Sequence, residues 1–214
     1  MYATVYLAEA VAMRLPDSAH TDRPWRIHEI ARDFELEDVW SVRAPGAGPD
    51  DFPVMLEAIR SSGGLARQAA PVKLLFAVRW GLGALLGWDR PRTGLGSRVR
   101  PLRDRLPSDL RDTVDDSAPV GSPFTPVYRL PDEDVREIAN GTVHGLMHLG
   151  WAPAPAADGG YELRMAVLVR PNGLVGRLYM AVITPFRYLI VYPMLTRQWE
   201  RAWRERGARA ATGS

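Results

Sequence analysis

The clearest alternation of apolar and polar residues lies in 161–170 and predicts a β-strand with two unlike faces. The more apolar face carries Tyr161, Leu163, Met165, Val167 and Val169, and the other carries Glu162, Arg164, Ala166, Leu168 and Arg170. Weaker patterns of the same kind predict strands at 36–43, 125–130 and 142–151. Residues 152–160 are typical of a hairpin loop, so the last two strands are expected to pair antiparallel.

Three other segments follow a helical pattern. Residues 52–61 begin after an aspartate cap and end at two glycines, and 71–86 are apolar nearly all round. The third segment, 174–206, predicts one long C-terminal helix with kinks at Pro185 and Pro193. The order of strand, two helices, antiparallel strands and long helix predicts an α+β fold.

The length of 214 residues suits one domain with an ample core, and we place that domain at 16–206. Residues 1–15 are expected to form an N-terminal extension, and 207–214 a disordered tail. Residues 88–123 have no sustained period. A connection of this length is either a lid over a pocket or a loosely ordered surface loop.

Composition narrows the function classes. The absence of cysteine removes disulfides, thiolate metal sites and a cysteine nucleophile. The basic residues are 26 arginines and a single lysine, Lys73, which with abundant Ala, Gly and Pro indicates a GC-rich actinomycete genome. The net charge of +2 gives little electrostatic footprint, so no nucleic-acid partner is expected. Gly81, Gly83 and Gly87 miss the dinucleotide-binding spacing by one residue, and no cofactor is expected.

The apolar stretches do not predict a membrane protein. The N-terminal residues lack a basic start and carry Glu9 within their apolar run, unlike a signal peptide. The stretches 72–88 and 174–195 both contain charged residues, and prolines interrupt the second, so no integral membrane segment is expected. We therefore expect a cytoplasmic protein, either a monomer or a homodimer.

The stretch 131–151 holds most of the candidate chemistry and centres on the pair Asn140-Gly141. This pair favours a two-residue hairpin turn, because both turn positions need positive φ. Under that interpretation 132–139 is a strand that pairs with 142–151. A short helix over 132–139, opened by a proline and acidic residues, fits the sequence equally well.

Two glutamate–histidine pairs follow from the hairpin. Glu137 would lie opposite His144, and Glu133 opposite His148, with all four side chains on one face. A buried imidazole beside a carboxylate is a general acid–base pair, so these four residues are the candidate catalytic groups. The alternative is that both histidines only satisfy buried hydrogen bonds. The i, i+4 histidine spacing fits a helical zinc site, but Gly145 stands where the catalytic glutamate would be, so no metal is expected.

Four segments carry a family resemblance: LPDSAHTDRPWRIHEIARDFELEDVW, GPDDFPVMLEAIRS, TVHGLMHLGW and MAVLVRPNGLVGRLYMAVITPFRYLIVYP. Together they resemble the actinobacterial domain-of-unknown-function family 2867 over residues 15–206. That family is similar to the START, polyketide-cyclase and Bet v 1 (SRPBCC) superfamily. The resemblance implies a helix-grip fold, in which a curved antiparallel sheet wraps a long C-terminal helix and two short helices follow the first strand. It also implies apolar or aromatic small-molecule ligands, without a mechanism.

In a helix-grip fold the inward face of the sheet and the inner side of the long helix line one cavity. The resemblance therefore places the candidate catalytic residues in that cavity with a set of ligand-binding candidates: Trp40, Arg43, Tyr128, Trp151, Tyr179, Arg187 and Tyr188. Arg187 stands alone in an apolar helix, which predicts either a ligand carboxylate or an ion pair with Glu133 or Glu137.

Three functions fit these expectations. The first is a cofactor-independent biosynthetic cyclase, dehydratase or isomerase that acts on a polyketide- or lipid-like molecule by His/Glu acid–base chemistry. The second is a non-catalytic protein that binds or carries such a molecule. The third is a membrane-surface protein that uses Trp199, Trp203 and the arginines of the last helix as an amphipathic foot. A hydrophobic small-molecule cavity is our expectation.

Overall fold

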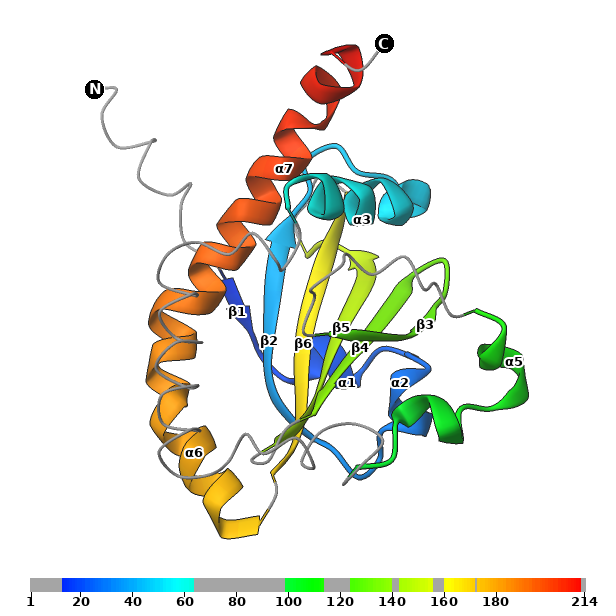
Figure 1. The fold of residues 1–214 in the computed structure, drawn as a ribbon. Coiled ribbons are helices and arrows are strands. Elements are labelled where there is room, and N and C mark those ends of the chain that lie inside the picture. The colour runs from blue at the N-terminus through cyan, green and yellow to red at the C-terminus, as the bar shows by residue number, and fades with distance from the viewer. Residues whose placement is uncertain are drawn as a thin grey trace.

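The computed structural model describes residues 13–63, 99–113, 124–139, 143–155, 160–171 and 173–212. Within this part the fold is α+β: a six-stranded antiparallel sheet has helices on both faces (Figure 1). None of the helices in these ranges is long and apolar enough to cross a membrane.

The sheet places the first long strand beside the last one. Its strands are β1 (Met13–Leu15), β2 (Glu35–Arg43), β3 (Thr125–Arg129), β4 (Glu133–Ala139), β5 (Val143–Pro153) and β6 (Tyr161–Pro171). Their order across the sheet is β1-β2-β6-β5-β4-β3, so β3 to β6 form a meander and β2 closes onto β6. The predicted strands are confirmed to within two residues at each end. The segment left open between strand and helix is a strand, β4.

Short helical turns follow β1 and precede β3. They are α1 (Ser18–Thr21), α2 (Ile27–Ile30), η2 (Leu102–Arg105) and α5 (Ser108–Arg111). After β2, the 3-10 turn η1 (Pro49–Asp51) leads into α3 (Phe52–Ser61), which matches the helix predicted there. The predicted helix at 71–86 lies outside the described residues.

The long C-terminal helix has three parts: α6 (Gly173–Phe186), a π-helical turn η3 (Arg187–Val191) and α7 (Tyr192–Thr212). Prolines were expected to kink this helix, and the irregular turn does lie between Pro185 and Pro193. A proline lacks the N–H that the helix needs and its ring crowds the carbonyl four residues earlier, which favours a widened turn here. The helix also continues past Gly207, where the sequence predicted a disordered tail, because alanine is the strongest helix former.

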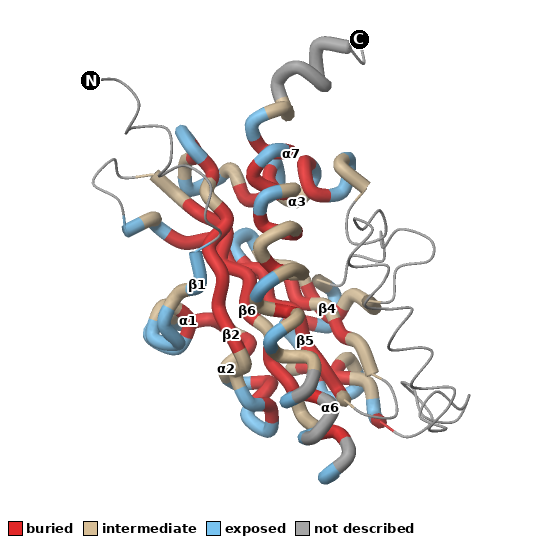
Figure 2. The backbone as a smooth tube through the Cα atoms, turned by 90° about the vertical axis from the view of Figure 1, so that its left-hand side faces the viewer, coloured by how far each residue is buried: buried red, intermediate tan, exposed pale blue. Residues whose placement is uncertain are grey.

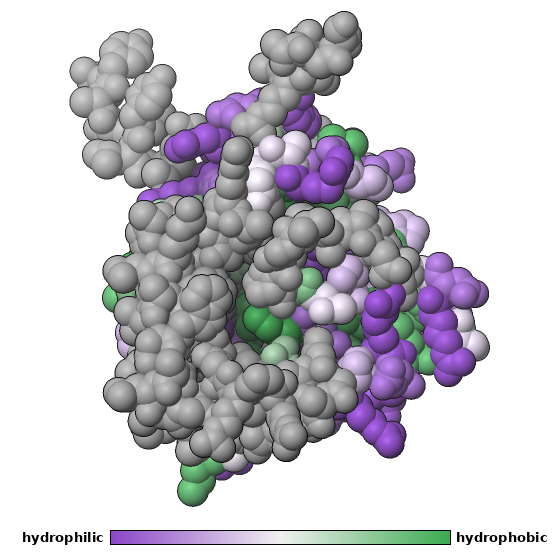
Figure 3. Space-filling model, viewed as in Figure 1, coloured by the Kyte–Doolittle hydropathy of each residue, from purple (hydrophilic) through white to green (hydrophobic). Residues whose placement is uncertain are grey.

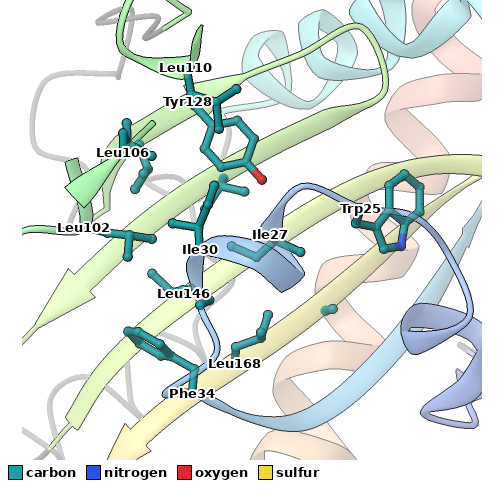
Figure 4. Close-up of a cluster of buried hydrophobic side chains, with 14 of the residues drawn as sticks. Trp25, Ile27, Ile30, Phe34, Leu102, Leu106, Leu110, Tyr128, Leu146 and Leu168 are labelled. Carbon is teal, nitrogen blue, oxygen red and sulfur yellow. The ribbon is translucent and has the colours of Figure 1, made fainter. Parts of the chain in front are cut away.

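One face of the sheet packs against α1, α2, η2 and α5. Figure 4 shows the apolar cluster between them, which contains Trp25, Ile27, Leu102, Leu106, Leu110, Tyr128, Leu146 and Leu168. Three of these leucines belong to the stretch 88–123, for which a lid or a surface loop was expected. In the described part of that stretch, 99–113, Val99, Leu102, Leu106 and Leu110 are buried in the core. The outer side of α2 and α5 is mostly hydrophilic (Figure 3).

The opposite face packs against α3 and the C-terminal helix. In Figure 2 this helix crosses in front of the sheet, and the strands behind it are mostly buried. The apolar cluster on this face contains Trp40, Phe52, Met55, Trp151, Met165, Tyr192, Leu195, Trp199 and Trp203. We call the first face the α2 face and the second the α7 face. Because side chains alternate along each strand, neighbouring residues of β2, β5 and β6 contribute to different faces.

Candidate functional site

The hairpin of β4 and β5 brings the candidate catalytic residues together on the α2 face. Its register differs from the predicted one by two residues, since Glu137 lies opposite Leu146 and Ala139 opposite His144. The residues between the two strands, 140–142, lie outside the described part. A shift of two residues keeps every side chain on its face, so both predicted glutamate–histidine contacts form diagonally rather than directly across the ladder.

The first contact joins Glu137 to His144. Nε2 of His144 lies 2.5 Å from Oε1 of Glu137, and the backbone N–H of Leu102 donates to the same carboxylate at 2.9 Å. On the other side of the ring, Nη2 of Arg170 lies 3.4 Å from Nδ1 of His144. Because the guanidinium can only donate, Nδ1 accepts and Nε2 carries the proton that faces Glu137. Both ring nitrogens of this buried histidine are therefore occupied.

The second contact belongs to a longer chain of groups. Nε2 of His148 lies 3.2 Å from Oε2 of Glu133, and Nδ1 of His148 lies 3.1 Å from Nε2 of His20. The Tyr128 hydroxyl donates to Glu133 at 2.8 Å, and the backbone N–H of Arg26 donates at 2.7 Å. If His148 is neutral and its Nε2 donates to Glu133, then Nε2 of His20 donates to Nδ1 of His148; if His148 is protonated, both of its ring nitrogens donate, one to Glu133 and one to His20. In either state, Nδ1 of His20 is buried without a partner among the described residues.

Burial and charge set the protonation states of this chain. Burial alone would raise the pKa of Glu133, but hydrogen bonds and charge from His148, Arg26 and Tyr128 bring it below the ordinary value. The pKa of Tyr128 is raised by burial and by the neighbouring carboxylate. Burial, with the nearby His148, His28 and Arg164, lowers the pKa of His20 to about 2. Glu133 is therefore ionised and His20 neutral at pH 7.

A different polar group lies on the α7 face, between β2 and the π-helical turn. Nη2 of Arg187 donates to Oδ2 of Asp38 at 2.7 Å, and Nε donates to the Tyr192 hydroxyl at 2.8 Å. The other carboxylate oxygen accepts from Nε1 of Trp40 at 2.8 Å. Arg187 thus forms an ion pair, as one alternative expected, but it pairs with Asp38 and, at 3.8 Å, with Glu37, rather than with Glu133 or Glu137. Those two glutamates lie across the sheet from it.

Three aromatic rings surround this ion pair. Trp40 lies 5.4 Å from Tyr192 and 6.2 Å from Tyr188 between ring centroids. The half-buried Tyr188 donates to the carbonyl of Glu37 at 3.3 Å and carries the Arg14 guanidinium 4.8 Å above its ring centre. We call Asp38, Arg187, Trp40, Tyr188 and Tyr192 the arginine cluster.

The electrostatics of the arginine cluster differ from those of an exposed ion pair. Burial raises the pKa of Asp38 to about 6, although Arg187 and the indole N–H of Trp40 act to lower it. The pKa of Arg187 is raised because Tyr192 and Asp38 outweigh burial. Asp38 is mostly ionised at pH 7, yet it needs only a small change of surroundings to take up a proton.

The other ligand-binding candidates lie in different surroundings. Arg43 pairs with Glu200 of α7 at 2.9 Å. Trp151 is buried beside Phe52, Tyr161 and Trp203. Tyr179 lies in α6, but its side chain is outside the described part.

The single cavity expected from the family resemblance does not bring all the candidates together. His144, His148, Glu133, Glu137 and Tyr128 lie on the α2 face, whereas Trp40, Trp151, Arg187 and Tyr188 lie on the α7 face. The reason is the pleat: His148 and Leu146 point to one side of β5, and Met147 and Leu149 to the other.

Sequence reasoning missed three members of these groups. Asp38 shares the apolar face of β2 with Trp40 and Val42, and an acid in that register was a usable signal for a partner. Tyr192 was not among the candidate residues. His20 lies in a short polar stretch that gave no local sign of its contact with His148, 128 residues away.

The described residues do not gather three potential ligands into a metal site. His144 and His148 lie four residues apart on a strand, not on the helix that the zinc-type spacing requires.

Comparison with known families gives one result. The family model described as Protein of unknown function (DUF2867) matches residues 30–194, so the chain belongs to this family. No curated protein and no solved structure matches the chain.

Proposed function

We propose that this DUF2867 member binds a hydrophobic small molecule, polyketide- or lipid-like, between the sheet and the C-terminal helix. The arginine cluster holds the polar end of this ligand. The observation that carries the proposal is the buried Asp38–Arg187 pair, placed in an apolar interface at a π-helical turn.

A buried ion pair contributes little net stability, because the desolvation of two charges offsets their attraction. Replacement by apolar residues of similar size would often stabilise the fold, so the pair argues for a use other than stability. π-Helical turns are rare and occur frequently at functional sites. Arg187 presents donors of fixed geometry, which suit a ligand carboxylate. Asp38 can then be released as the neutral acid, because its pKa is already about 6.

The apolar surroundings of the arginine cluster suit the rest of such a ligand. Under α6, the described apolar cluster contains Val169 and Met180 as buried residues, while Val143, Val167 and Ile183 stay partly exposed. Among the described side chains, burial is more extensive under α7, where Trp199 and Trp203 are 0% and 1% exposed. The ligand is therefore proposed to lie along α6 rather than under α7.

The order of elements also supports the proposal. A first long strand, β2, beside the last strand, a meander from β3 to β6 and a long C-terminal helix are what we expect of a helix-grip fold. We propose in addition that the chain is similar to the START, polyketide-cyclase and Bet v 1 superfamily. Members of that superfamily hold apolar ligands between sheet and helix.

Binding of a long-chain fatty acid and its methyl ester, measured by titration calorimetry, tests the proposal. The acid is expected to bind more tightly than the ester, and Arg187→Met should remove roughly tenfold or more of that affinity, as for a lost charge-assisted hydrogen bond. His144→Gln is the matched control, because it changes a buried polar group on the α2 face. Equal loss in both variants, or no preference for the acid, would contradict the proposed site.

A second candidate function, acid–base catalysis, is favoured by the Glu137–His144 and Glu133–His148 contacts. Both carboxylates orient an imidazole, as a general base requires. Solvent deuterium exchange next to the ketone of a β-keto ester, followed by NMR, tests this function. Acceleration by the protein that is lost in His144→Gln or His148→Gln would support catalysis; no acceleration would remove it. Both histidine rings are buried, and every ring nitrogen of His144 and His148 already has a hydrogen-bond partner. Binding of a small molecule, the first candidate function, therefore agrees better with these contacts than acid–base catalysis does.

A further inference from the structure

The outward side of the C-terminal helix carries a continuous stripe of exposed residues. Among the described positions of α6, η3 and α7, the exposed ones recur every three or four residues, apart from the half-buried Pro193. After the first residue of α6, Gly173, they are Leu174, Arg177, Ala181, Pro185, Leu189, Arg197, Arg201 and Arg204. Successive members lie on neighbouring turns of the helix. Each four-residue step advances by about 40° around an α-helix, and the wider turn η3 takes back part of that advance, so the exposed positions form a slowly winding row that we call the outer stripe.

The outer stripe is apolar in its first part, apart from Arg177, and cationic in its second. Leu174 and Leu189 are 81% and 76% exposed, the two highest values among the exposed large hydrophobic residues of the described part. Arg197 and Arg201 follow on the exposed side of α7. None of the exposed, described positions of this helix is acidic, because Glu200 is buried and Glu205 is half-buried.

We propose that the outer stripe is a docking face for an anionic lipid surface, with Leu174 and Leu189 entering the headgroup boundary and Arg177, Arg197 and Arg201 contacting lipid phosphates. A surface helix of this kind combines apolar burial with attraction of arginines to anionic lipid. An apolar protein partner would not require the row of arginines, and a nucleic acid would not require the exposed leucines. Charge and exposure together therefore favour a membrane surface.

The proposed face differs from the amphipathic foot expected from the sequence. Trp199 and Trp203 were assigned to that foot, but both are buried against the sheet and α3. The lipid-facing residues now lie on the opposite side of the same helix. This proposal is independent of the ligand site, since the arginine cluster lies on the inner side of the helix.

Co-sedimentation of the full chain with vesicles tests the docking face. Vesicles of pure phosphatidylcholine are compared with vesicles that contain phosphatidylserine, at low salt and at 1 M salt. Binding is expected only with the anionic vesicles and should fall steeply at 1 M salt, where the screening length is about 3 Å. Arg197→Gln with Arg201→Gln should weaken partitioning roughly tenfold. Leu174→Asp with Leu189→Asp should weaken it by at least as much.

Matched controls separate the docking face from general effects of charge. Arg60→Gln with Arg105→Gln removes the same charge from exposed positions elsewhere, and Val54→Asp places an acid at another exposed apolar position. These variants should bind as the wild type does. Equal losses in controls and stripe variants, or binding to both kinds of vesicle alike, would overturn the proposal. So would a dimer that Leu189→Asp dissociates in size-exclusion chromatography without any vesicle binding, or retention of the protein on an oligonucleotide but not on vesicles.

Discussion

Each glutamate of β4 binds both a histidine ring and a backbone N–H of a segment that covers the sheet. Glu137 accepts from Leu102 at the start of η2, and Glu133 accepts from Arg26 just before α2. Both carboxylates therefore have a structural role, whatever chemistry they perform. They fix two short helical turns that are too short to be stable by themselves.

Removal of one side chain from these glutamate–histidine contacts should lower the stability of the fold. His144→Ala removes the imidazole partner of the buried Glu137 carboxylate and leaves the backbone N–H of Leu102 to satisfy it. We expect the free energy of unfolding to fall by about 3 kcal/mol. Urea denaturation followed by circular dichroism measures this change. The control is Glu57→Gln, which removes an exposed ion pair with Arg60 and should change stability by less than about 0.5 kcal/mol. A His144→Ala cost as small as that of the control would refute the buried contact.

His20 gives the stability a defined pH dependence. Its pKa is about 2 in the folded protein and 6.5 in the unfolded chain, so the unfolded state binds more protons between these values. The stabilisation is complete above pH 6.5 and is lost as the pH falls below it. From pH 7 to pH 5 we expect a loss of roughly 2 kcal/mol from this residue. Unfolding free energies at several pH values measure it, and His20→Gln should flatten the slope. Parallel slopes in the two proteins would contradict this role.

At the scale of elements, β5 approaches Trp25 so closely that only glycine fits at position 150. A Cβ there would lie 2.8 Å from two indole carbons of Trp25 and 2.9 Å from Cε1 of His148. At Gly145 of the same strand, the nearest atom would be a methyl carbon of Ile138 at 3.4 Å. The two glycines are therefore a matched pair on one strand.

Gly150→Ala should destabilise the protein by about 2 kcal/mol, because the added methyl group displaces Trp25 from the core. Gly145→Ala should leave stability within about 1 kcal/mol of the wild type. Thermal unfolding of both variants, compared at the same protein concentration, tests the difference. If both substitutions cost the same, the close approach of Trp25 to β5 is wrong.

The Asp38–Arg187 pair joins β2 to the π-helical turn, and a double-mutant cycle measures that link. Arg187→Met should cost about 3 kcal/mol, because it leaves a buried carboxylate without its partner. Asp38→Asn with Arg187→Met should cost less than the sum of the two single changes. Urea denaturation of the four proteins gives the coupling energy. Additive effects would show that the two side chains do not interact.

The sequence predicts an element well where its signal is local, and poorly where the element depends on pairing with a distant strand. The alternation in β6 and the start and stop signals of α3 are local, and the structure confirms both elements. Whether 132–139 is a strand depends on pairing with β5, so no local pattern could decide it. The register was also wrong by two residues, yet the faces were right, because alternation has a period of two.

At the scale of the whole molecule, the sequence could not say which helices cover which face. The contact of His20 with His148 and that of Asp38 with Arg187 join segments 128 and 149 residues apart. Only the folded arrangement separates an α2 face with histidines and glutamates from an α7 face with the arginine cluster. The expectation of one shared cavity came from the family resemblance, and the observed placement divides its residues between two layers.

The central claim is that a hydrophobic ligand lies on the α7 face, along α6. Photo-crosslinking with a diazirine-labelled fatty acid, followed by peptide mass spectrometry, tests it most directly. We predict crosslinks on β2 near Trp40 and on the helix near Tyr188, and their loss when unlabelled acid competes. Crosslinks concentrated on β4 or α2, around Glu133 and Ile27, would place the ligand on the α2 face and contradict the account.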